Sequence, residues 1–150
     1  MGMTIAEKII ALAAGVPEVK AGDIHTVTLD RMMSNDGTTH LTVDMYHNKL
    51  KHPRIADPKK MVFIVDHNVP SDSPKTAASQ KKMRDFAREH GIDFWEGKGV
   101  CHQVMIENYV RPGELIFGAV ISIIGLESTA FVNTSGCFSR YRAAIAPPIE

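Results

Sequence analysis

Hydrophobic residues recur along this chain in two patterns, short continuous runs and amphipathic segments with helical spacing. The runs are rich in β-branched and aromatic residues and predict strands at 24–29, 61–65, 92–95 and 115–119. Apolar residues three or four positions apart predict helices at 4–14, 38–50 and 76–90. Because strands and helices alternate, we expect a layered α/β/α domain with a largely parallel sheet.

Local signals support two of these helices. Thr4 and Glu7 form a capping-box pattern at the start of the first helix, and Gly15 favours its end. Ser73 suits an N-cap, with Pro74 at the first helical position of the longest helix. The helical spacing predicts that the following side chains face the core: Ile5, Ile9, Leu12, Leu41, Met45, Leu50, Ala78, Met83, Phe86 and Ala87.

The apolar run from Met61 to Val65 ends abruptly in Asp66 and His67, and Pro70 then breaks the segment. Such a run is typical of a strand buried on both faces of a parallel sheet. Open α/β sheets bind ligands at the carboxyl ends of their strands. A carboxylate beside an imidazole can fix its tautomer and exchange protons near neutral pH. Asp66 and His67 are therefore candidate catalytic residues; the alternative is a surface loop that contains this pair by chance.

A second histidine, His102, follows the next predicted strand after a glycine-containing turn at 96–99. Because the carboxyl ends of parallel strands meet at one edge, we expect His102 on the same side of the sheet as Asp66 and His67. The adjacent Cys101 has no second cysteine two to four residues away, so this pair does not predict a zinc site.

Three further histidines, His40, His47 and His52, lie along or just after the predicted helix at 38–50. Their spacings of seven and five residues do not place two ligands on one helix face, so we predict no metal site there. We interpret His25 as a surface strand residue.

Composition excludes several classes of protein. The chain has 150 residues, enough for one domain, and its 17 Lys and Arg balance 17 Asp and Glu, so neither nucleic acid nor an acidic membrane is the expected partner. No apolar run reaches the length of a membrane span, and Glu7 and Lys8 interrupt any signal peptide. Two cysteines and eight methionines favour a reducing cytoplasm.

Four segments, 3–9, 65–70, 99–104 and 109–119, carry a family resemblance. They read Met-Thr-Ile-Ala-Glu-Lys-Ile, Val-Asp-His-Asn-Val-Pro, Gly-Val-Cys-His-Gln-Val and Tyr-Val-Arg-Pro-Gly-Glu-Leu-Ile-Phe-Gly-Ala. In this order and at these intervals, residues 1 to about 119 resemble the N-terminal part of the large subunits of the aconitase and 3-isopropylmalate dehydratase family. The resemblance implies the start of an aconitase-type iron-sulfur domain.

The resemblance also implies a function, a hydro-lyase and isomerase that acts on a hydroxy-di- or tricarboxylic acid in leucine biosynthesis or a related pathway. In the full-length family, three cysteines hold a [4Fe-4S] cluster whose open iron acts as a Lewis acid on the leaving hydroxyl. A small swivel-domain subunit is the expected partner. By position, Asp66 and His67 match the catalytic Asp-His pair, His102 matches a second catalytic histidine, and Asn35 matches a polar residue close to the substrate.

The resemblance ends after Ala119. The family continues with an Asp-Ser-His-Thr run, so the aspartate that partners His102 would fall at Val120 and a further histidine at Ser122. Neither Cys101 nor Cys137 matches a cluster ligand, and we expect those ligands to be absent from this chain. The isolated chain should therefore have little or no dehydratase activity.

Residues 120–150 form a divergent tail, and we hypothesise that the gene is frameshifted or truncated after codon 119. A genuine alternative C-terminus is the other interpretation. The coding DNA distinguishes them, because a shift of one or two bases should restore the Asp-Ser-His-Thr run. If neither shift restores it, the frameshift is excluded.

Two other functions remain open at this point. One is a non-catalytic α/β remnant or carboxylate-binding module without a cluster. The other, ranked last, is a metal-dependent hydrolase that uses Asp66, His67 and His102.

Overall fold

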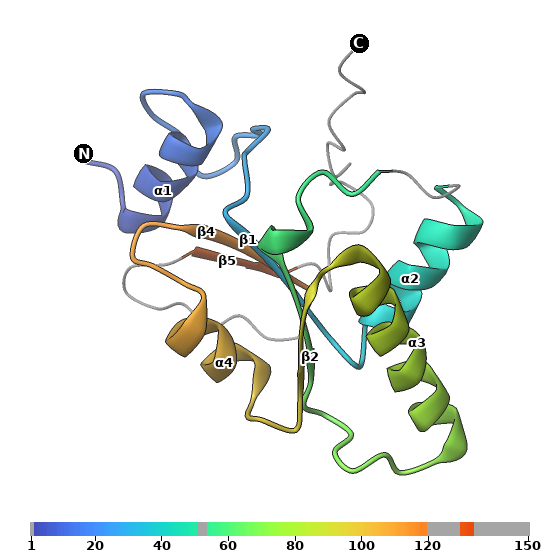
Figure 1. The fold of residues 1–150 in the computed structure, drawn as a ribbon. Coiled ribbons are helices and arrows are strands. Elements are labelled where there is room, and N and C mark those ends of the chain that lie inside the picture. Colours follow the sequence, from blue (N-terminus) through green and yellow to red (C-terminus); the bar gives the residue numbers. More distant parts are fainter. Residues whose placement is uncertain (1, 51–53, 120–129, 134–150) are drawn as a thin grey trace.

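The computed structural model describes residues 2–50, 54–119 and 130–133 (Figure 1). Within these ranges, five strands form one sheet in the order β3-β2-β1-β4-β5, and every neighbouring pair is parallel. The strands are β1 (Arg31–Asn35), β2 (Met61–Val65), β3 (Asp93–Glu96), β4 (Leu115–Ala119) and β5 (Ala130–Asn133). The prediction of a largely parallel sheet is confirmed.

Helices connect the strands and cover both faces of the sheet. They are α1 (Ile5–Ala14), α2 (Thr39–Asn48), α3 (Pro74–His90) and α4 (Cys101–Asn108), with a short 3₁₀ turn at Pro58–Lys60. Figure 1 shows α2 and α3 together on one side of the sheet and α4 on the other. None of the helices in the described ranges combines the length and apolar composition needed to cross a lipid bilayer.

Strand β2 explains the layers, because its side chains alternate between the two faces. Val62 and Ile64 pack with the buried side chains of α4, and Phe63 and Val65 pack with those of α2 and α3. All four are at most 1% exposed. A strand buried on both faces needs a continuous apolar run, as its sequence predicts.

The order of the strands fixes where a site can form. Strands β2 and β3 lie on one side of β1, and β4 and β5 lie on the other, so the direction of strand addition reverses beside β1. Ligands of open α/β sheets bind at such a reversal, outside the carboxyl ends of the strands.

The predicted strand at 24–29 is wrong. The chain there is irregular, and Ile24 is 88% exposed. The strand begins instead at Arg31, in a segment for which the sequence predicts no strand. Its Met-Met-Ser-Asn sequence has little β-propensity, but β1 pairs with β2 on one side and β4 on the other. This segment therefore forms a strand because it pairs with a neighbour on each side, and not because of its local β-propensity.

The predicted helix ends are largely confirmed. The capping box of Thr4 and Glu7 is present, and Gly15 ends α1 in a left-handed conformation with φ of 67°. Ser73 caps α3 and Pro74 is its first residue, so this helix begins two residues before the predicted range.

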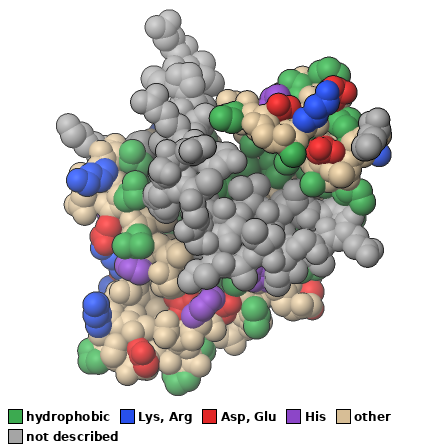
Figure 2. All heavy atoms as spheres, turned by 180° about the vertical axis from the view of Figure 1, so that it is seen from behind, with side chains coloured by type: hydrophobic (Ala, Val, Ile, Leu, Met, Phe, Trp, Pro, Cys, Tyr) green, Lys and Arg blue, Asp and Glu red, His purple; other side chains and the backbone are tan. Residues whose placement is uncertain are grey.

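The predicted inward faces are only partly correct. Ile9, Met83, Phe86 and Ala87 are buried as expected. The exposed members of the predicted set are Ile5, Leu12, Leu41, Met45, Leu50 and Ala78. The helical spacing identifies an apolar stripe on α2, but the helix packs through Val43, which is fully buried. Figure 2 shows hydrophobic side chains on the surface of the part of the molecule that contains α1.

Replacing Val43 by alanine tests this correction. Loss of two buried methyl groups should lower the free energy of unfolding by about 2 kcal/mol. Leu41→Ala on the same helix is the matched control and should cost less than about 0.5 kcal/mol, since Leu41 is 57% exposed. Urea denaturation measures both values. A larger loss for Leu41→Ala would restore the original assignment of the buried face.

Candidate functional site

The carboxylate of Asp36, directly after β1, holds the loop that follows β2. Its side chain is only 2% exposed. Oδ1 accepts hydrogen bonds from the backbone N–H groups of Asp66 at 3.4 Å and His67 at 3.1 Å. Oδ2 accepts from the backbone N–H of Asn68 at 2.9 Å and from its Nδ2 at 3.4 Å. One buried carboxylate thus satisfies three consecutive backbone donors.

These hydrogen bonds keep Asp36 ionised. Burial alone would raise the pKa of this carboxyl, but the donors on Asn68, His67 and Asp66 outweigh that effect and hold the pKa below its ordinary value. Asp36 therefore carries a negative charge at neutral pH.

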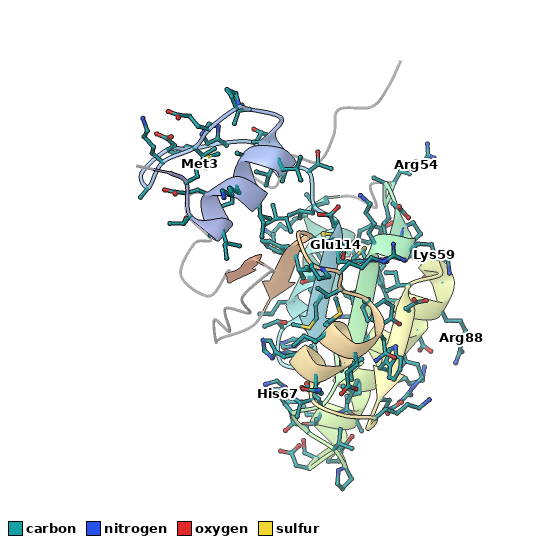
Figure 3. All side chains as sticks on the ribbon, turned by 90° about the vertical axis from the view of Figure 1, so that its left-hand side faces the viewer. Met3, Arg54, Lys59, His67, Arg88 and Glu114 are labelled. Carbon is teal, nitrogen blue, oxygen red and sulfur yellow. The ribbon has the colours of Figure 1, made fainter. Side chains whose placement is uncertain are left out.

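The imidazole of His67 lies against two carboxylates. Its Nδ1 is 2.6 Å from Oδ1 of Asp66 and 3.5 Å from Oδ1 of Asp36. Ionised carboxylates only accept hydrogen bonds, so Nδ1 must carry a proton. In the neutral ring, Nε2 is then the basic nitrogen. The His67 side chain is 54% exposed, and Figure 3 shows it towards the opposite ends of the strands from Glu114 and Lys59.

Asp66 connects this histidine to helix α4. Its Oδ2 accepts a hydrogen bond of 2.6 Å from the backbone N–H of Cys101, the first residue of the helix. A helix N-terminus has unpaired N–H groups and a partial positive charge, both of which stabilise a carboxylate. Since the Asp66 side chain is only 4% exposed, both of its oxygens are fixed in place.

Helix α3 holds the same loop from another side through Gln80. Its Nε2 donates to the carbonyl oxygen of Asn68 at 2.8 Å, and the Ser71 hydroxyl donates to its Oε1 at 2.5 Å. Gln80 is only 4% exposed, although a glutamine among lysines gives no sequence signal of burial.

The structure brings the predicted catalytic residues to one edge of the sheet. His102 is the second residue of α4, half-buried, with Nδ1 3.4 Å from Sγ of Cys101. Because the backbone N–H of Cys101 binds Asp66, the first turn of α4 lies beside Asp66 and His67. Residue 120, where the family has an aspartate to partner His102, lies outside the described residues.

Asn35, predicted to lie close to a substrate, is the last residue of β1 and is 3% exposed. Its Oδ1 accepts from the backbone N–H of Gly37 at 3.0 Å and from the Thr38 hydroxyl at 3.3 Å. The side chain therefore stabilises the turn after β1. Its role toward a substrate stays a prediction.

The sequence does not predict a functional role for Asp36. Its place directly after a strand would have indicated it, but that strand itself was not predicted. Gln80 gave no such signal.

The described residues contain one group of three potential metal ligands, Asp36, Asp66 and His67, whose nearest ligand atoms lie within 4.8 Å of one another. Hydrogen bonds from the loop already occupy Asp36, and His67 and Cys101 occupy Asp66. This group is therefore a hydrogen-bonded cluster.

No described group of this kind includes His102, His40 or His47. The hypothesis of a metal-dependent hydrolase requires Asp66, His67 and His102 together, whereas the described group contains the first two of them with Asp36. His52 lies outside the described residues.

Cys101 is buried, and its thiol is expected to be unreactive. Burial and the nearby Asp66 carboxylate raise the pKa of its thiol to about 12, and hydrogen bonds to His102 and Asn35 only partly offset this. Since the thiolate is the nucleophile and the metal-binding form, Cys101 is protonated and unreactive at neutral pH.

This predicts that iodoacetamide at pH 7.5 leaves Cys101 largely unmodified in the native protein and modifies it readily in urea. Mass spectrometry of the peptide that contains Cys101 measures the modified fraction. Asp66→Ala should increase the native rate, because it removes a negative charge beside the sulfur. Rapid native alkylation of Cys101 without that substitution would contradict the assignment.

Comparison with known proteins gives a family and several relatives. The profile of the aconitase family (aconitate hydratase) matches residues 7–119. The probable 3-isopropylmalate dehydratase large subunit of Methanothermobacter thermautotrophicus is 43% identical over 121 residues, which cover 79% of this chain and 29% of the relative. The probable methanogen homoaconitase large subunit of the same organism is 41% identical over 123 residues, or 78% of this chain and 29% of the relative.

A third relative, 3-isopropylmalate dehydratase large subunit 1 of Pyrococcus furiosus, is 44% identical over 122 residues, or 79% of this chain and 28% of the relative. The chain therefore spans less than a third of the length of these curated relatives. The family match includes the segments that carry Asp36, Asp66, His67 and His102.

Proposed function

The chain belongs to the aconitase family, and from this premise we propose that it forms the N-terminal part of the active site of a hydro-lyase and isomerase of the 3-isopropylmalate dehydratase type. Its substrate is a hydroxy-di- or tricarboxylic acid, in leucine biosynthesis or a related cytoplasmic pathway. The names of the relatives support this substrate class, and their designation as large subunits supports a small-subunit partner.

The observation that carries the proposal is the contact of 2.6 Å between Nδ1 of His67 and Asp66 at the carboxyl edge of the sheet. A hydroxyl leaves carbon as water only if an acid gives it a proton, and the reverse reaction needs a base. With Nδ1–H held by a carboxylate, Nε2 of His67 is the ring nitrogen that can give or accept that proton. His67 is half exposed, so a substrate can reach the ring.

Two further residues have proposed roles. His102, beside the Asp66–Cys101 contact, is the second proton-transfer group. Asn35 supports the turn after β1 through its Oδ1, which accepts hydrogen bonds from Gly37 and Thr38, so a direct contact with the substrate would use its Nδ2 amino group.

The cluster of the full-length family does not fit the cysteines described here. Three thiolates are required, whereas the whole chain has two cysteines, and Cys137 lies outside the described residues. Cys101 is buried with a thiol pKa of about 12, the opposite of a ready thiolate ligand. This chain's own cysteines therefore cannot hold the cluster, and we propose that the isolated chain lacks dehydratase activity.

The alternative of a carboxylate-binding module has less support. Among the described contacts of Asp36, Asp66 and His67, no lysine or arginine takes part. An anionic ligand held here by this chain alone would face two buried negative charges.

A chimera tests the proposal. Residues 7–119 of this chain would replace the matching segment of the Methanothermobacter thermautotrophicus large subunit, combined with that enzyme's small subunit. We expect the chimera to dehydrate 3-isopropylmalate. His67→Gln in the chimera should lower kcat about 10²–10⁴-fold with a smaller change in KM, because it removes the proton-exchanging nitrogen.

His25→Gln is the matched control, since His25 lies in the irregular segment before β1, and it should leave kcat unchanged. Full activity of the His67→Gln chimera would refute the proton-transfer role. Dehydratase activity of the isolated chain after anaerobic treatment with iron and sulfide would refute the statement that this chain alone is inactive.

A further inference from the structure

One carboxylate oxygen of Asp36, Oδ1, contacts both the backbone N–H and the imidazole ring of His67. Oδ1 accepts from the backbone N–H of His67 at 3.1 Å and lies 3.5 Å from Nδ1 of the same residue. We propose that Asp36 is a positioning residue that, together with Asp66, fixes the Nδ1–H tautomer and orientation of His67. Only the link between this tautomer and proton transfer rests on the proposed function.

The electrostatic argument concerns which ring nitrogen keeps the proton. If Nε2 carried it, the lone pair of Nδ1 would face carboxylate oxygens at 2.6 and 3.5 Å, and both contacts would be repulsive. Asp36 is 2% exposed, so solvent screens its charge weakly. Asp66 supplies the short hydrogen bond, and Asp36 adds a second penalty against the other tautomer.

Asp36 is itself fixed from both sides. Its own backbone N–H donates to the carbonyl oxygen of Ile64 at 3.1 Å, which continues the pairing of β1 with β2. Its side chain accepts hydrogen bonds from the backbone of residues 66–68, in the loop that directly follows β2. Main chain and side chain together hold the carboxylate at one distance from the ring.

Asp36→Asn isolates the role of the carboxylate because it preserves side-chain size. The amide has one acceptor oxygen in place of two, and its NH₂ group must face either the backbone N–H of Asn68 or the N–H groups of His67. The negative charge near Nδ1 is lost at the same time.

The test is long-range ¹H–¹⁵N NMR of the histidine rings in the full 150-residue chain at a pH where they are neutral, with His67 assigned from His67→Gln. We expect the Nδ1–H form in the unsubstituted protein and loss of that form to a tautomer mixture in Asp36→Asn. Asp57→Asn is the matched control, because Asp57 caps the 3₁₀ turn through the backbone N–H of Lys59. It should leave His67 unchanged.

Asp66→Ala is a second, independent variant that does not depend on whether Asp36→Asn folds. With Asp66 gone, Asp36 is the remaining carboxylate beside Nδ1, and we expect the Nδ1–H form to stay in excess of its share in free histidine. A folded Asp36→Asn protein with an unchanged tautomer would overturn the proposal, as would an Asp66→Ala protein with the mixture of free histidine. These readouts need no substrate, so they stand apart from the activity of the chimera.

Discussion

Strand β1 in the middle of the parallel sheet is the constraint on which the rest of this structure depends. Its pairing with β2 brings the residue after each strand to one edge, so Asp36 reaches the loop that starts at Asp66. Its pairing with β4 on the other side creates the reversal of strand order. Without this central strand, neither the buried carboxylate nor the histidine it faces would have a fixed position.

The site is built almost entirely from backbone donors and buried acceptors. Asp36 binds three consecutive N–H groups, Asp66 binds the first N–H of α4, and Gln80 binds the carbonyl oxygen of Asn68. The buried side chains of Asp36, Asp66 and Gln80 thus all have hydrogen-bond partners, which is the condition for burying a polar group at low cost. The imidazole of His67 is the exposed end of this network.

The sequence predicts what depends on local pattern and misses what depends on tertiary pairing. Strand β2 and helix α3 follow from a continuous apolar run and from Ser73 with Pro74, so their positions and the Asp66–His67 pair could be predicted. Strand β1 could not, because its stability comes from two neighbours and its own residues favour no strand. Asp36 was missed for the same reason, and the buried face of α2 depends on packing against the sheet that periodicity alone does not reveal.

The hydrogen bonds between Asp36 and the main chain affect which substitutions this fold can accept during evolution. The bonds to residues 66 and 67 involve only backbone N–H groups, which every amino acid except proline offers. The path of the loop is therefore largely independent of the side chain at position 67. A different side chain can therefore be placed at this edge without a change in the backbone that carries it.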